Sequence, residues 1–147
     1  MIKARVLQRS RITRYDGNFS SLSVFLLSSA PKVTDTETAD ACGEGTFSFA
    51  EHSFSFRYKE EESGITVAVE KTGNSITVNR GGATLLFRMG EVTAFDYRTA
   101  YGVLRMEAYT EEVTLKEKGN TYLLTLVYIA AFGGMAQKNE IRFKITL

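Results

Sequence analysis

The feature that most constrains the fold is an alternation of apolar and polar side chains, which dominates the chain from residue 46 onward. In IRFKITL, residues 141–147, every second side chain is apolar and the side chains between them are polar. The segment HSFSFRYKE, residues 52–60, repeats the pattern with Phe54, Phe56 and Tyr58 on one side. Successive side chains of a β-strand point to opposite faces of its sheet. Each segment therefore predicts a strand with one buried and one solvated face.

Turn residues separate these segments. Glycine adopts the positive φ angles that tight hairpins need, so glycine-containing pairs between alternating runs indicate hairpin turns. The turn signals are Asp16-Gly17, Ser63-Gly64, Gly73-Asn74, Gly81-Gly82, Gly90, Gly119-Asn120 and Gly133-Gly134. No stretch shows helical periodicity with caps at its ends. The pattern predicts an all-β protein, an antiparallel barrel or sandwich with roughly eight to ten strands.

Two segments do not follow the simple pattern. Residues 18–41 lack a clear period, and the sequence is compatible with a strand plus a long loop or with a short helix. YLLTLVYIAAF, residues 122–132, is apolar on both faces. A strand of that kind needs cover on its second face, which residues 18–41 or a second subunit would supply.

The strand that begins after Tyr101-Gly102 changes its apolar phase. Its apolar positions are even-numbered in residues 104–108 and odd-numbered at Val113 and Leu115. A change of phase requires a β-bulge or a turn, which we expect near residues 110–112. Tyr101-Gly102 itself predicts a tight corner, with the tyrosine ring covering one end of the barrel.

Length and composition predict one soluble domain, residues 1–147. The 18 basic and 17 acidic residues nearly balance, so net charge indicates no partner. Cys42 is the single cysteine, which excludes an intrachain disulfide and fits a reducing compartment. The first residues have no apolar core of signal-peptide length, and the longest apolar run is far shorter than the roughly 18 residues of a membrane helix. We therefore expect a cytoplasmic protein that does not bind membranes.

The order of short motifs resembles the YwiB-like family of uncharacterised bacterial proteins. The matching elements are Gly45, Tyr58, Glu60, Gly64, Arg80-Gly81, Phe87, Thr99, Tyr101-Gly102, Thr110 and Tyr128. The resemblance covers about residues 43–147 and the first strand, and it is weakest for residues 18–41. It implies a calycin-like β-barrel similar to lipocalins in a bacterial cytoplasm, and it implies no activity.

The candidate site is one end of this barrel. Glu60 continues the inward face that ends at Tyr58, and Arg80 continues the inward face of Ile76 and Val78. Charged groups on an apolar face are rarely buried unless they are paired, so we expect Glu60 and Arg80 to lie close together, near Tyr58 or Tyr101. One interpretation is a ligand pocket with converging polar groups. The other is an ion pair that only closes the barrel end, since side chains often fill small barrels.

Basic residues on one strand face offer an alternative site. Lys3, Arg5, Arg9 and Arg11 share the outer side of the first strand. If the first and last strands pair, Lys138, Arg142 and Lys144 lie beside them. Such a stripe fits RNA or another polyanion, but no aromatic side chain interleaves it for base stacking. The other interpretation is a solvated face that is partly offset by nearby acids such as Glu140. The sequence favours this interpretation and makes nucleic acid the less favoured partner.

The remaining chemistry is sparse. Cys42 and His52 are the only cysteine and histidine, no nucleophile motif flanks them, and together they cannot supply a zinc ligand set. We expect no metal and no cofactor. The leading hypothesis is a non-enzymatic module that binds a small, mostly apolar molecule through Tyr58, Glu60, Arg80 and Tyr101. The alternatives are an interaction module for protein or nucleic acid and, last, a Cys/His enzyme. The sequence allows a monomer or a homodimer.

Overall fold

The computed structural model describes residues 2–29 and 31–147, and the side chains of residues 97–99, including that of Thr99, lie outside the description. Within the described residues, ten strands and one short helix, α1 (Leu22–Leu26), make up the fold. The strands are β1 (Ile2–Tyr15), β2 (Val33–Ala50), β3 (Ser53–Lys59), β4 (Thr66–Thr72), β5 (Ser75–Arg80), β6 (Ala83–Arg88), β7 (Val92–Thr99), β8 (Gly102–Lys118), β9 (Thr121–Phe132) and β10 (Met135–Thr146). The predicted all-β antiparallel class is confirmed.

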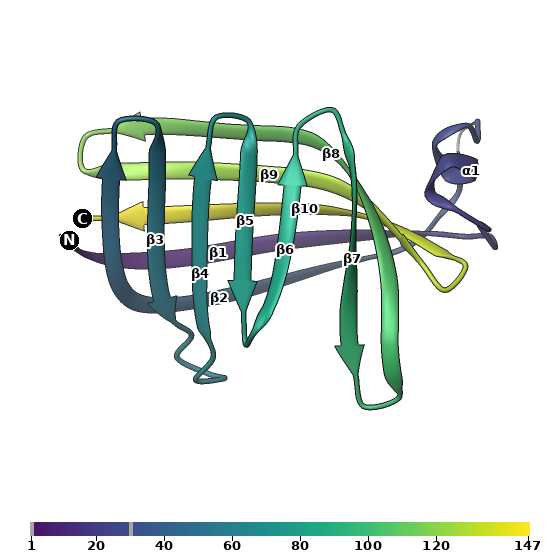
Figure 1. Cartoon of the computed structure of the whole chain (residues 1–147), viewed down its shortest axis with the longest axis horizontal. Helices are drawn as coiled ribbons and strands as arrows, with labels where there is room; N and C mark the ends of the chain where they lie inside the picture. The colour runs from purple at the N-terminus through teal and green to yellow at the C-terminus, as the bar shows by residue number, and fades with distance from the viewer. Residues whose placement is uncertain (1, 30) are drawn as a thin grey trace.

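All ten strands belong to one sheet in the order β6-β5-β4-β3-β2-β1-β10-β9-β8-β7. The sheet folds over itself, so that β3 to β6 cross the strands β1, β10, β9 and β8 at a steep angle (Figure 1). Its two edge strands, β6 and β7, lie close together. The Thr93 hydroxyl of β7 donates a hydrogen bond to the Leu86 carbonyl oxygen of β6 at 2.6 Å. The Gly90 N–H also donates to the Thr110 carbonyl oxygen at 2.8 Å. The result is a nearly closed barrel, compatible with the calycin-like fold that the resemblance implies.

Aromatic side chains fill the interior between the two layers. The rings of Phe56 and Phe143 lie 5.2 Å apart between centroids, and Phe47 stacks on Tyr122 at 4.9 Å. At the other end of the core, Phe87 packs against Tyr128 at 4.4 Å. These rings come from strands of both layers, so they hold the front of the barrel to its back. Small barrels are commonly filled by side chains in this way.

β2 runs through both layers and bends strongly between them (Figure 1). Gly43 and Gly45 lie where it bends, and Gly45 pairs with Tyr58 of β3. A Cβ atom at Gly45 would overlap the backbone carbonyl of Arg57, and one at Gly43 would overlap that of Lys59. Neither glycine has a positive φ, so the bend requires the absence of a side chain rather than a special backbone conformation.

The phase change in β8 has the predicted cause. The pairing of β8 with β9 shifts register between Thr110 and Glu112, which is the irregularity expected near residues 110–112. The expectation for Tyr101 is wrong in one respect. Tyr101 lies in the turn that joins β7 to β8, and Gly102 is the first residue of β8, but the Tyr101 side chain is fully exposed and covers no barrel end.

Residues 18–41 divide into two parts. Ser21 caps α1 by accepting a hydrogen bond from the Val24 N–H, and the helix buries Leu22 and Phe25. The helix contacts β8 and β9, so it supplies part of the cover that the apolar strand β9 needs. From Val33 onward the chain is the first half of β2, paired with β1.

Candidate functional site

A pocket of about 530 Å³ lies where β2 and β3 separate. The β2–β3 ladder ends with a hydrogen bond from the Glu61 N–H to the Cys42 carbonyl oxygen at 2.9 Å, after which residues 60–65 turn back into β4. The pocket lies in the fork between this turn and β2. We call it the barrel-end pocket, and it is lined by Leu7, Gln8, Ser10, Ala39, Asp40, Ala41, Cys42, Glu60, Glu61, Glu62, Ser63 and Arg80.

Glu60 and Arg80 meet in this pocket, as their positions in the two strand patterns predict. The Arg80 Nη2 atom lies 2.8 Å from Glu60 Oε1, and the Ser63 hydroxyl donates to the same oxygen at 2.7 Å. The Glu60 side chain is 7% exposed, whereas that of Arg80 is 48% exposed. Burial raises the pKa of Glu60, but the hydrogen bonds from Arg80 and Ser63 and the charge of Arg80 outweigh it and lower the pKa overall. The wall of the pocket therefore carries an ionised carboxylate.

Tyr58 lies next to this pair, inside the barrel. Its hydroxyl donates a hydrogen bond to Gln8 Oε1 at 2.8 Å, and its ring is buried. Burial raises the pKa of Tyr58, and the charge of Glu60 raises it further against the opposing effect of Arg80, so the phenol is neutral. Sequence reasoning missed Gln8. The available signal was its position, since Gln8 continues the inward phase of Ala4 and Val6.

Cys42 also lines the barrel-end pocket, where it belongs to a second polar group with Arg5 and Glu61. Arg5 Nη1 lies 3.0 Å from Glu61 Oε1, and the Cys42 Sγ atom lies 3.4 Å from Glu61 Oε2. The hydrogen bond to Glu61, burial and the charge of Glu61 raise the pKa of Cys42, which keeps the thiol protonated. His52 lies in the turn after β2 and pairs with Glu51 at 3.9 Å.

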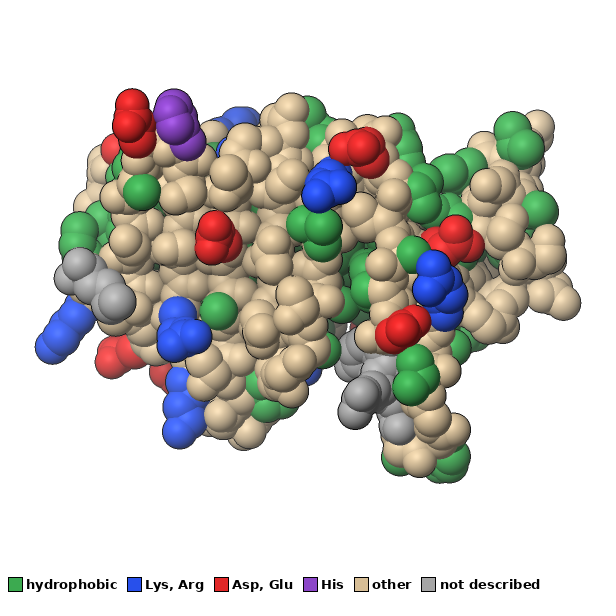
Figure 2. All heavy atoms as spheres, viewed as in Figure 1, with side chains coloured by type: hydrophobic (Ala, Val, Ile, Leu, Met, Phe, Trp, Pro, Cys, Tyr) green, Lys and Arg blue, Asp and Glu red, His purple; other side chains and the backbone are tan. Residues whose placement is uncertain are grey.

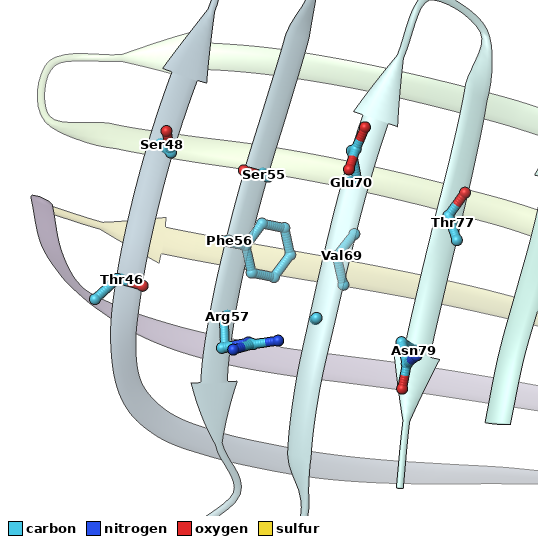
Figure 3. Close-up of a pocket in the computed structure, with 10 residues that line it drawn as sticks. Thr46, Ser48, Ser55, Phe56, Arg57, Val69, Glu70, Thr77 and Asn79 are labelled. Atoms are coloured by element: carbon cyan, nitrogen blue, oxygen red, sulfur yellow. The ribbon is translucent and has the colours of Figure 1, made fainter. Parts of the chain in front are cut away.

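Two of the four predicted site residues, Glu60 and Arg80, line the barrel-end pocket. Tyr58 lies behind it and is hydrogen-bonded to Gln8 of its lining, whereas Tyr101 does not line it. A second, smaller hollow of about 320 Å³ lies on the outer face of β2 to β5. Figure 3 shows that short polar side chains such as Ser48, Ser55 and Thr77 surround it. No salt bridge among the described residues involves Arg57 or Glu70 in this hollow, and it lacks the converging hydrogen bonds of the barrel-end pocket.

Two structural features are absent from the described part of the chain. It contains no group of three or more His, Cys, Asp or Glu side chains that could hold a metal ion. No helix in that part has the length and apolar composition needed to cross a membrane.

The lowered pKa of Glu60 predicts a pH-dependent contribution to stability. A carboxylate whose pKa is lower in the folded state stabilises the fold above its unfolded-state pKa of about 4.3, and this contribution disappears as the pH falls through the folded-state value. We expect Glu60→Gln to lower the free energy of unfolding at pH 7 by about 1–3 kcal/mol. The difference from the wild type should shrink as the pH is lowered to about 3.

Urea unfolding at the two pH values measures this difference. Glu51→Gln is the matched control, because the Glu51 side chain is 90% exposed and its replacement should change stability by less than about 0.5 kcal/mol at either pH. A loss in Glu60→Gln that is the same at both pH values would show that the ionised carboxylate contributes nothing.

Comparisons with known proteins agree with the fold described above. The family model for a domain of unknown function, DUF1934, matches residues 28–143. The crystal structure of the ywiB protein from Bacillus subtilis is similar over 96% of this chain and 91% of that chain, with a TM-score of 0.65 and 15% sequence identity. At that identity the likeness shows the fold, and it confirms the YwiB-like resemblance. The search of curated proteins found no match.

Proposed function

Because the chain belongs to the DUF1934 family, whose function is unknown, and folds as a nearly closed barrel, we propose from its own pocket that it is a non-enzymatic module for binding a small molecule. The observation that carries the proposal is the pairing of Glu60 with Arg80 in the wall of a 530 Å³ pocket. Ligand sites are typically concave, with apolar walls and a few fixed polar groups.

The two walls of the barrel-end pocket suggest the kind of ligand. Leu7, Ala39 and Ala41 contribute apolar surface on one side, and Glu60 and Arg80 contribute a fixed donor and acceptor on the other. A small molecule with an apolar body and one polar group would satisfy both. Because aromatic rings fill the barrel, the ligand would bind at its end and not in its interior.

The proposal includes a cytoplasmic setting and no catalytic step. A lone thiol fits a reducing compartment, and the raised pKa of Cys42 argues against a thiolate nucleophile. The competing explanation is that the Glu60–Arg80 pair only closes the barrel end. The two explanations differ in whether the pocket contains a bound small molecule when the protein is purified from cells.

Native mass spectrometry of protein purified without denaturing steps tests the proposal. We expect an added mass on the wild-type protein that is lost on denaturation. Ala41→Phe fills the pocket and should remove the added mass, whereas Ala68→Phe, in the outer hollow, should keep it. A bare mass for the wild type, or an added mass that survives in Ala41→Phe, would contradict the proposal. The same spectrum distinguishes a monomer from a homodimer, and circular dichroism checks that both variants are folded.

A further inference from the structure

The strand pairing places basic side chains from three strands on one outer face of the barrel. Arg9 of β1 lies directly opposite Arg142 of β10, and Lys144 of β10 pairs with Leu123 of β9, which pairs in turn with Lys116 of β8. Side chains of directly paired residues point to the same face of a sheet. We call this surface the basic face, and it consists of Arg5, Arg9, Lys116, Lys118, Arg142 and Lys144.

Carboxylates border the basic face on two sides. Glu140 of β10 and Glu112 of β8 both pair with Val127, so they lie on the same face beyond Arg142 and Thr114. At the β2 edge, Arg5 lies 3.0 Å from Glu61. Glu44 and Asp40, both on β2, lie 3.9 Å from Arg5 and 3.8 Å from Arg9. The part formed by β8, β9 and β10 presents only threonine and leucine between its cations. These residues are Thr114, Thr121, Leu123, Thr125 and Thr146.

Four exposed cations lie on the part of the basic face formed by β8 and β10. Lys116, Lys118, Arg142 and Lys144 are exposed, and among the described residues no salt bridge joins any of them to a carboxylate. Like charges directly opposite each other in a sheet are unfavourable, yet Arg9 faces Arg142. Since the whole chain carries a net charge of only +1, these cations make one face distinctly positive. An anion with repeated charges is the partner that this arrangement fits.

The opposite face of the barrel has a different character. Figure 2 shows the surface of β3 to β6, where single basic and acidic side chains are interspersed. Arg57 and Lys59 of β3 and Arg88 of β6 are exposed cations on that side. The basic face is therefore a local feature and not a property of the surface as a whole, and the cations of the opposite face provide a matched control.

We infer that the basic face binds the phosphate backbone of double-stranded nucleic acid. Clustered Lys and Arg side chains recognise phosphates without reading sequence. The residues between the cations are threonine and leucine, so this part of the face offers no aromatic platform on which unpaired bases would stack. The sequence pattern alone favoured a solvated face. In the structure, Arg11 and Lys138 of that stripe form salt bridges with Glu140 and Glu111. The structure also adds Lys116 and Lys118 of β8, which the stripe on the first and last strands did not include.

Fluorescence anisotropy with labelled DNA and RNA duplexes of about 24 base pairs tests the inference. With about four phosphate contacts, the affinity of the wild type should fall about a hundredfold between 50 and 200 mM salt. The triple variant Lys116→Glu, Arg142→Glu, Lys144→Glu should lose binding at 50 mM salt. The control triple variant Arg57→Glu, Lys59→Glu, Arg88→Glu has the same change in net charge and should stay within about threefold of the wild type.

Several results would overturn the inference. The first is that neither duplex binds at 50 mM salt. The second is that the two triple variants lose the same amount of affinity for the duplexes. The third is that a single strand of the same length binds more tightly than the duplexes. Binding of vesicles that contain anionic lipid, without binding of duplexes, would assign the face to membranes and also overturn it. Thermal unfolding of both triple variants shows whether they are folded, and a preference between the DNA and RNA duplexes identifies the source of the phosphates.

Discussion

Gly45→Ala is expected to lower the free energy of unfolding by about 3 kcal/mol or more, which is enough to leave much of the protein unfolded or insoluble. The added methyl group would overlap the carbonyl group of Arg57 on the paired strand β3. Backbone atoms of a paired strand cannot move aside as the end of a flexible side chain can. The overlap would therefore separate β2 from β3 at the bend, and the barrel-end pocket opens where these two strands part.

Gly73→Ala is the control for this prediction. Gly73 has a φ of +58°, and a Cβ atom there would meet nothing within 4 Å. Its replacement should cost only about 1 kcal/mol, from the strained backbone. Urea unfolding followed by circular dichroism compares the two variants, and the yield of soluble protein gives a second measure if Gly45→Ala does not fold. Equal stability of the two variants would show that β2 can bend without a glycine at position 45.

The alternation of side chains predicted most strands because one face of each is buried. It failed in the first half of β2 for a physical reason. Residues 33–41 run beyond the packed core, and their inward side chains include Asp35 and Glu37, which Arg14 of β1 holds at 3.0 and 2.8 Å. This part of β2 is held by its backbone pairing with β1, and its side chains are exposed. It therefore carries no apolar period, and its sequence did not distinguish it from a loop.

The part of the candidate site that lies on strands could be predicted from the alternation of inward and outward side chains. Glu60 and Arg80 each continue an inward apolar face, and that phase was enough to expect them together. Tyr101 was misplaced because a turn signal shows where the chain reverses, and not whether the hairpin ends at the barrel or extends beyond it. Lys116 and Lys118 were missed because their neighbours depend on the order of strands β8, β9 and β10, and because the bulge after Thr110 changes the phase of β8.

Phe56→Ala should destabilise the protein by about 3–5 kcal/mol, which corresponds to a fall in Tm on the order of 10 °C. Phe56 is 3% exposed, and its ring contacts those of Phe54, Tyr58 and Phe143 at centroid distances of 5.8, 6.2 and 5.2 Å. Its removal would leave a cavity between the two layers of the barrel. Phe49→Ala removes the same side chain from a position that is 63% exposed, and it should cost less than about 1 kcal/mol.

This comparison also bears on where a ligand would bind. If Phe56→Ala destabilises the protein no more than Phe49→Ala does, the interior is not packed as described, and a ligand inside the barrel becomes the better hypothesis. If the two variants differ by the expected amount, the aromatic rings of the interior are needed to hold the two layers together. The interior then has no space for a ligand. The pocket beside Glu60 and Arg80 is then the place where this barrel can bind a small molecule without losing its core.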